Sequence, residues 1–170
     1  MRDHNGMRPL DIVILMKLVA LDNQPWQYRD LSSCLYISIS EISESLNRSI
    51  LAGLVDQGSK KIRRNSLMEF IQYGFHYVFP QVPGALVNGI ATAHSHPYYS
   101  SSIVSQIPYV WPSPTGTIRG QAIQPLHKGV VKAVLKDEIL YKLLASLDIL
   151  RVGKVREINI ALNELKSQIL

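Results

Sequence analysis

The chain has 170 residues, of which 46% are hydrophobic, and a formal net charge of +5. This composition supplies enough apolar surface for one packed domain, with or without a small appendage, and excludes a wholly disordered chain. The single cysteine, Cys34, excludes an intramolecular disulfide framework and fits a reducing cytoplasm. The mild positive charge permits a polyanionic partner without requiring one.

The first predicted element is an apolar helix over residues 11–22, opened by Pro9. Lys17 interrupts the apolar run and acidic residues flank it, so the segment does not read as a signal peptide. It is also too short to cross a bilayer. We therefore expect a cytoplasmic protein that makes no membrane contact.

Two short helices joined by a tight turn are predicted next. Leu31 and Leu35 are four residues apart on a helix that starts near Gln27, and Ile42 and Leu46 are four apart on the next helix. Ile37 would fill the corner between the two helices. Ser38 and Glu41 have the spacing of a capping box, which places the second helix start at residue 39. Short helix, turn and capped helix are typical of a helix-turn-helix.

The polar positions of the second helix are candidates for DNA contact, because they lie off its apolar stripe. Small hydroxyl side chains can reach phosphates or base edges, Asn47 could read adenine, and Arg48 could read guanine or hold a phosphate. The candidates on the cap and on this face are Ser38, Ser40, Ser43, Glu44, Asn47 and Arg48.

The stretch YRDLSSCLYISISEISESLNRSILAGLV, residues 28–55, resembles the core of bacterial winged helix-turn-helix transcription regulators, broadly of the MarR-like kind. The resemblance extends over residues 10–79 and implies a DNA-binding domain over residues 8–79. This chain has Tyr36 where that pattern commonly has glycine, which costs strain if the residue needs a positive φ. The wing over residues 56–61 is short, with room for only a small hairpin around Gly58.

A basic cluster follows the short wing. It consists of Lys60, Lys61, Arg63 and Arg64. These cations are either a solvated face or a phosphate clamp beside the helix-turn-helix. A helix capped by Asn65 or Ser66 is predicted over residues 67–73, and residues 75–80 have strand composition.

Residues 80–129 are rich in proline, glycine and serine and predict a long irregular region with a few short strands. No acidic residue lies between Glu69 and Asp137, whereas four cations do. Residues 112–120 are a hairpin candidate because they are rich in turn residues.

His94 and His96, followed by Pro97, resemble the metal-binding signature of the MPN-type metalloproteases. Two histidines at this spacing on a strand would point to the same side and could reach one zinc ion. The family has an aspartate downstream, whereas this chain has Ile107 there, so the site lacks a carboxylate. We therefore expect hydrogen-bonded histidines and no metal.

The last 41 residues, 130–170, predict a helical pair. The first helix covers residues 137–150, and the second has an apolar seam at spacings of three and four. The seam residues are Val155, Ile158, Leu162, Leu165 and Ile169. The seam either packs within one chain or forms a dimer interface, and the family resemblance favours a homodimer.

Together these features predict an α+β, mostly helical protein with three segments, 8–79, 80–129 and 130–170. The expected function is sequence-specific binding of double-stranded DNA as a prokaryotic transcription regulator, with a recognition helix at about residues 39–52. No catalytic residue, cofactor or metal is expected. The alternatives are an antitoxin-like or defence-linked protein-interaction module, and a zinc-dependent hydrolase that uses His94 and His96.

Overall fold

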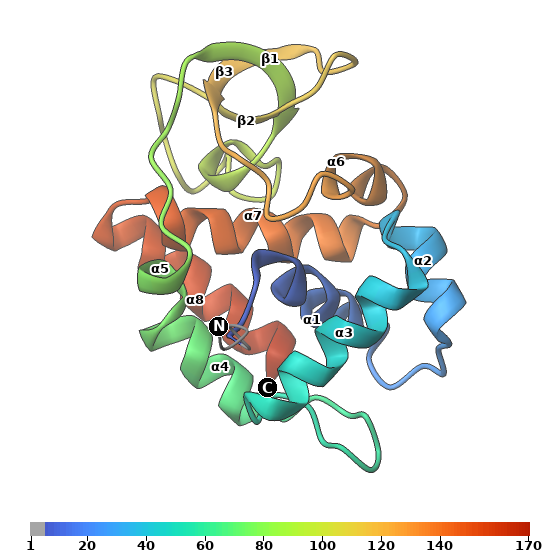
Figure 1. The fold of residues 1–170 in the computed structure, drawn as a ribbon. Helices are drawn as coiled ribbons and strands as arrows, with labels where there is room; N and C mark the ends of the chain where they lie inside the picture. The colour runs from blue at the N-terminus through green and yellow to red at the C-terminus, as the bar shows by residue number, and fades with distance from the viewer. Residues whose placement is uncertain (1–5) are drawn as a thin grey trace, which may run out of the picture.

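The computed structural model describes residues 6–170 and shows an α+β chain in which a helical body carries a small three-stranded sheet lobe (Figure 1). The lobe lies on one side of helix α7, and the remaining long helices lie on the other (Figure 1). The elements are α1 (Pro9–Leu21), α2 (Tyr28–Leu35), α3 (Ile39–Leu51), α4 (Arg64–Tyr73), α5 (Phe75–Val78), β1 (Leu86–Ala91), η1 (Ala93–Ser95), β2 (Tyr109–Pro112), β3 (Ile118–Ala122), α6 (Val130–Ala133), η2 (Val134–Lys136), α7 (Glu138–Val152) and α8 (Val155–Ile169).

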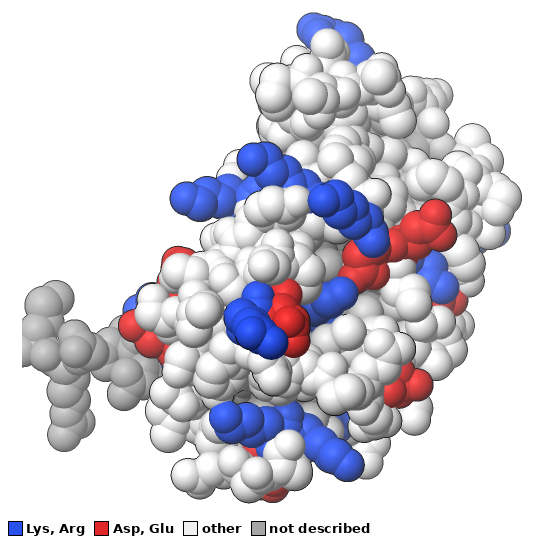
Figure 2. Space-filling model, turned by 90° about the vertical axis from the view of Figure 1, so that its right-hand side faces the viewer, with Lys and Arg blue, Asp and Glu red and all other residues white. Residues whose placement is uncertain are grey.

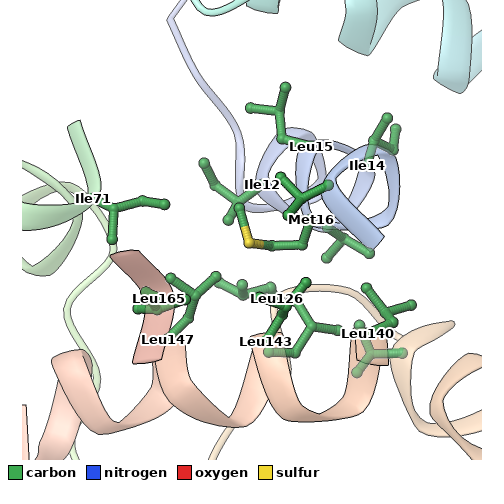
Figure 3. Packing of buried hydrophobic residues seen from close by; sticks show 14 of the residues in the cluster. Ile12, Ile14, Leu15, Met16, Ile71, Leu126, Leu140, Leu143, Leu147 and Leu165 are labelled. Carbon is green, nitrogen blue, oxygen red and sulfur yellow. The ribbon is translucent and has the colours of Figure 1, made fainter. Parts of the chain in front are cut away.

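Helix α1 is the centre of the helical body. It is buried around most of its circumference because α7 packs on one side of it and α3 on another. Figure 3 shows Ile12 and Met16 of α1 facing Leu143 of α7. The predicted apolar helix is therefore confirmed, and its lack of a polar face follows from having neighbours on several sides.

A single hydrophobic cluster extends across the three predicted segments. Ile12 of α1, Leu67 of α4 and Leu143 of α7 belong to it, as do Leu165 and Ile169 of α8, all at most 1% exposed. The C-terminal helices are therefore packed against the N-terminal ones within the same chain.

This packing corrects the reading of the C-terminal seam as a free dimer surface. Leu165 and Ile169 are fully buried inside the chain, where α8 contacts α7 and α4. Ile158 and Leu162 are partly buried and pack against the same core, while Val155 is 76% exposed. The helical spacing of the seam predicts that its apolar face is buried, but it does not predict whether the same chain or a second chain packs against it.

The sheet lobe confirms the expectation of short strands in residues 80–129. β1 pairs antiparallel with β2 through Ile90 and Trp111, and antiparallel with β3 through Val87 and Gly120. β2 and β3 run parallel to each other, so the hairpin predicted at residues 112–120 is wrong. Both strands use β1 as their partner, and the turn-rich sequence between them is a crossover.

Residues 75–78 form a helical turn and not the predicted strand. Phe75 is fully buried and its ring meets that of Phe79 edge to face, with centroids 5.6 Å apart. Two aromatic side chains four residues apart come together over one helical turn, whereas in a strand the same spacing would separate them by about 13 Å. Tertiary packing of the rings thus overrides the strand preference of the segment.

A buried polar network fastens the sheet lobe to α7. The Asp148 carboxylate accepts hydrogen bonds from Thr92 Oγ1 (2.8 Å) and Trp111 Nε1 (2.7 Å), and it pairs with Arg151 Nη1 (2.9 Å). Arg151 also donates to the carbonyl oxygens of Phe79 (3.0 Å) and Gln124 (3.0 Å). Burial raises the pKa of Asp148, and these donors oppose that shift.

Candidate nucleic-acid interface

α2 and α3 are joined by a three-residue corner, residues 36–38, that the sequence predicts closely. Tyr36 adopts the left-handed conformation (φ 58°, ψ 43°) at the end of α2, and Ile37 is buried in the corner. A tyrosine in this conformation carries the strain that glycine would avoid. Cys34, on α2, is half-buried, and burial raises the pKa of its thiol, which makes it a poor nucleophile.

The capping box at the start of α3 is confirmed. The backbone N–H of Glu41 donates to Ser38 Oγ (3.3 Å), and the backbone N–H of Ser38 donates to Glu41 Oε2 (3.2 Å). The Ser38 hydroxyl also donates to Glu41 Oε2 (2.7 Å), and the hydrogen bonds from Ser38 lower the pKa of Glu41. α3 therefore begins at Ile39 because its first turn is satisfied locally.

The outer face of α3 carries most of the predicted DNA-contacting side chains. Ser40, Glu44 and Asn47 are exposed and Ser43 is partly exposed. Ser38 lies at the helix start, where its hydroxyl is engaged by Glu41. The exposed side chains are short and polar, which suits close approach to a groove.

The prediction that Arg48 projects from this face is wrong. Its guanidinium turns inward and forms a two-pronged pair with Asp11 of α1, with Nε–Oδ2 and Nη2–Oδ1 distances of 2.9 and 2.7 Å. Asp11 is fully buried and Arg48 is 9% exposed. The hydrogen bonds that Arg48 donates to the Asp11 carboxylate raise the pKa of Arg48. One carboxylate on a helix far away in sequence thus decides the direction of the arginine.

The wing is a short loop closed by one antiparallel bridge between Val55 and Ile62. The backbone N–H of Asp56 donates to the carbonyl of Lys61 (2.8 Å), and that of Lys60, at φ 55°, donates to the carbonyl of Asp56 (2.9 Å). Ser59 donates to the Asp56 carboxylate through its backbone N–H and its hydroxyl, and these bonds lower the pKa of Asp56. The abbreviated hairpin expected from the sequence is therefore present.

The four cations of the basic cluster have different surroundings. Lys61 is exposed, and Arg63 is half-exposed with Asp56 at 3.6 Å. Lys60 donates to the Tyr28 hydroxyl (2.5 Å) and lies 4.6 Å from the centre of that ring. Lys61 and Arg63 are thus the cations of this cluster that lie most open to a phosphate.

The Arg64 side chain is engaged in contacts within the chain, so its assignment to DNA contact is corrected. It donates to Asp22 (2.9 Å) and to the carbonyl oxygen of Ile169 (2.9 Å), and it thereby connects the first turn of α4 to the end of α8. α4 begins at Arg64, earlier than the predicted caps Asn65 and Ser66.

A hollow of about 570 Å³ lies between the wing and the loop that connects α1 to α2. Trp26 and Tyr28 form a tilted ring pair on its wall, with centroids 5.9 Å apart, and Lys60, Lys61 and Arg64 also line it. The sequence analysis did not predict this hollow, although Trp26 in the connector and Tyr28 at the start of α2 were a signal for it. The hollow therefore presents aromatic ring faces and positively charged side chains to a ligand.

His94 lies on the 3-10 turn η1 and His96 directly follows it, so neither histidine is on a strand and the predicted side-by-side arrangement does not form. His94 Nε2 lies 3.1 Å from the carbonyl oxygen of Ile107, and His96 Nδ1 accepts from the backbone N–H of Tyr98 (3.1 Å). Burial lowers the pKa of His96 to about 4. Within residues 6–170 no three histidine, cysteine or acidic side chains gather as a metal site would need.

No family model, curated protein or solved structure matches this chain. Among residues 6–170, none of the helices has the length and apolar character that a membrane span requires.

Proposed function

We propose that the chain is a winged helix-turn-helix protein that binds double-stranded DNA as a transcription regulator. The observation that carries the proposal is the geometry of α2, the Tyr36–Ile37 corner and the capped α3, followed by a short wing. In a helix-turn-helix of this kind the second helix, here α3, enters the major groove of DNA, and the first helix, here α2, crosses the DNA backbone. The exposed polar face of α3 and the open cations of the wing support this assignment.

The proposed base-reading residues are Ser40, Ser43 and Asn47, with Lys61 and Arg63 on phosphates. Asn47 has the amide geometry that recognises adenine by two hydrogen bonds. Arg48 is omitted from the readers because Asp11 holds it inside the chain. Specificity therefore rests on fewer and shorter side chains than the sequence predicts, and it would use water bridges and groove shape as well.

The proposal is tested by selecting duplexes from random double-stranded DNA and measuring their affinity by gel shift. Asn47→Ala should weaken binding to the selected duplex by about 1–3 kcal/mol and relax the preference at one base pair. Asn159→Ala is the matched control, because Asn159 is an exposed asparagine on α8. Failure to enrich any duplex would refute the proposal. An Asn47→Ala variant with unchanged affinity and preference would refute the reading role of that residue.

A second candidate is a protein-contact role for the same helix, which two exposed apolar side chains on α3 favour. Ile39 is 51% exposed and Leu51 is 72% exposed, at opposite ends of the helix. An exposed apolar side chain at a helix end offers an anchor point to a protein partner. The DNA selection separates the two candidates, because a protein-binding helix would enrich no duplex.

We further propose that two chains bind DNA as a dimer, because two linked helix-turn-helix units bind more tightly than one through their effective concentration. The part of the α8 seam left for such a contact begins at Val155. Light scattering at micromolar concentration should then give twice the chain mass of 19.1 kDa. Val155→Asp should shift that mass toward one chain without unfolding it. A wild-type mass of one chain would restrict the seam to internal packing.

A further inference from the structure

Three lysines beside the α2–α3 corner have no carboxylate partner. Lys128, Lys132 and Lys136, which we name the lysine row, are exposed, and none forms an ion pair with a residue in the described range 6–170. Several other cations do lie within ion-pair distance of a carboxylate. They are Lys17, Arg29, Arg48, Arg63, Arg64, Lys142 and Arg151.

The fold places the lysine row against the corner through a close backbone contact. A Cβ at Gly129 would lie 2.3 Å from the carbonyl oxygen of Leu35, so only glycine allows α6 to sit this close to the end of α2. Lys132 Nζ lies 5.7 Å from the centre of the Tyr36 ring. The row is thus fixed next to the residue that forms the corner.

The row also reaches the electrostatic surroundings of α3. The hydrogen bonds from Ser38 are the main cause of the lowered pKa of Glu41, in the first turn of α3, and the charges of His127 and Lys128 lower it further. Figure 2 views the side of the molecule where α2 and α6 lie in Figure 1; lysine and arginine side chains gather on it in several groups, and acidic side chains adjoin some of these groups. No acidic residue lies between Glu69 and Asp137, so the residues from Lys128 to Lys136 carry only positive charge; of the two acidic residues that follow Lys136, Asp137 is paired with Lys17.

We propose that the lysine row is a second phosphate-contacting surface, which holds the DNA backbone beside the groove that α3 enters. Lys128 lies in the turn before α6, Lys132 lies in α6 and Lys136 ends η2, so the three lysines follow one short helical run at intervals of four residues. Phosphates of one strand repeat at about 3.4 Å along the duplex axis, so closely spaced lysines can each meet a phosphate of the same strand. This inference rests on the proposed function, because it adds backbone contacts to the same complex.

The test compares the wild-type chain with the triple variant Lys128→Ala/Lys132→Ala/Lys136→Ala on one duplex selected by the wild type. Each lost phosphate contact should reduce the slope of log affinity against log salt by about 0.9. Between about 50 and about 200 mM salt, the affinity loss should therefore be about forty-fold smaller in the triple variant. Hydroxyl-radical footprinting should show the loss of backbone protection at one flank. All three side chains are exposed, so circular dichroism and the melting temperature should remain those of the wild type.

Two further variants sharpen the result. Arg119→Ala, in β3 of the sheet lobe, removes a cation from the same acid-free segment and should leave slope and footprint unchanged. Gly129→Ala keeps every charge but displaces α6 from Leu35, and it should lose the flank protection. A triple variant with the wild-type slope and footprint would overturn the inference while the proposed function stands. A wild-type chain that enriches no duplex would overturn both.

Discussion

Replacing Arg48 separates a core role from a DNA-reading role. Arg48→Met leaves the Asp11 carboxylate fully buried, with the backbone N–H of Arg8 (2.8 Å) still donating to it. Removal of one partner from a buried ion pair costs about 3–5 kcal/mol, because the other charge is left uncompensated. For a chain of this size, that loss lowers the melting temperature by roughly 6–20 °C.

A double-mutant cycle assigns the cost to the pair. Asp11→Leu should destabilise the chain by a similar amount, about 3–5 kcal/mol, whereas Asp11→Leu/Arg48→Met should recover most of the loss because no buried charge remains. The measurement is the free energy of unfolding in urea, followed by gel shift of the folded variants. Arg63→Met, on the exposed wing, is the control and should change stability by no more than about 0.5 kcal/mol. Wild-type stability combined with lost DNA binding in Arg48→Met would refute the reasoning, because it is the signature of a base-reading arginine.

Three further predictions address the cap, the buried histidine and the lobe. Ser38→Ala should cost about 1 kcal/mol in thermal unfolding, whereas the exposed Ser33→Ala should be neutral. The pKa of His96 is lowered from 6.5 to about 4, so the unfolded chain binds more protons, and stability should fall as the pH drops from 6.5 toward 4. His96→Gln should flatten that dependence of the urea midpoint, and His76→Gln should not. Asp148→Ala leaves Arg151 buried and unpaired, so limited proteolysis should cut residues 80–129 before the helical body; an unchanged cleavage pattern would contradict this.

The sequence by itself determined the local elements that depend on nearby residues. The α3 start follows from a capping box that closes within four residues, and the burial of Ile37 follows from its place between two apolar pairs. The apolar run of α1 required a helix covered on several sides. The short wing was also readable, because six residues around Gly58 leave no room for a longer hairpin.

Only the tertiary structure decided what covers each face and where each long side chain turns. Arg48 points inward because Asp11, 37 residues earlier, is buried beside it. A local sequence pattern cannot predict a contact between residues so far apart in the chain. Leu165 and Ile169 pack within the chain because α7 and α4 cover them, and the same spacing would serve a partner chain equally well. The lysine row lies at the corner because Gly129, which has no side chain, lets the Leu35 carbonyl oxygen come close to it. This contact joins segments about ninety residues apart. Periodicity fixes which face of a helix is apolar, whereas the direction of a flexible cation depends on charges that the fold brings to it.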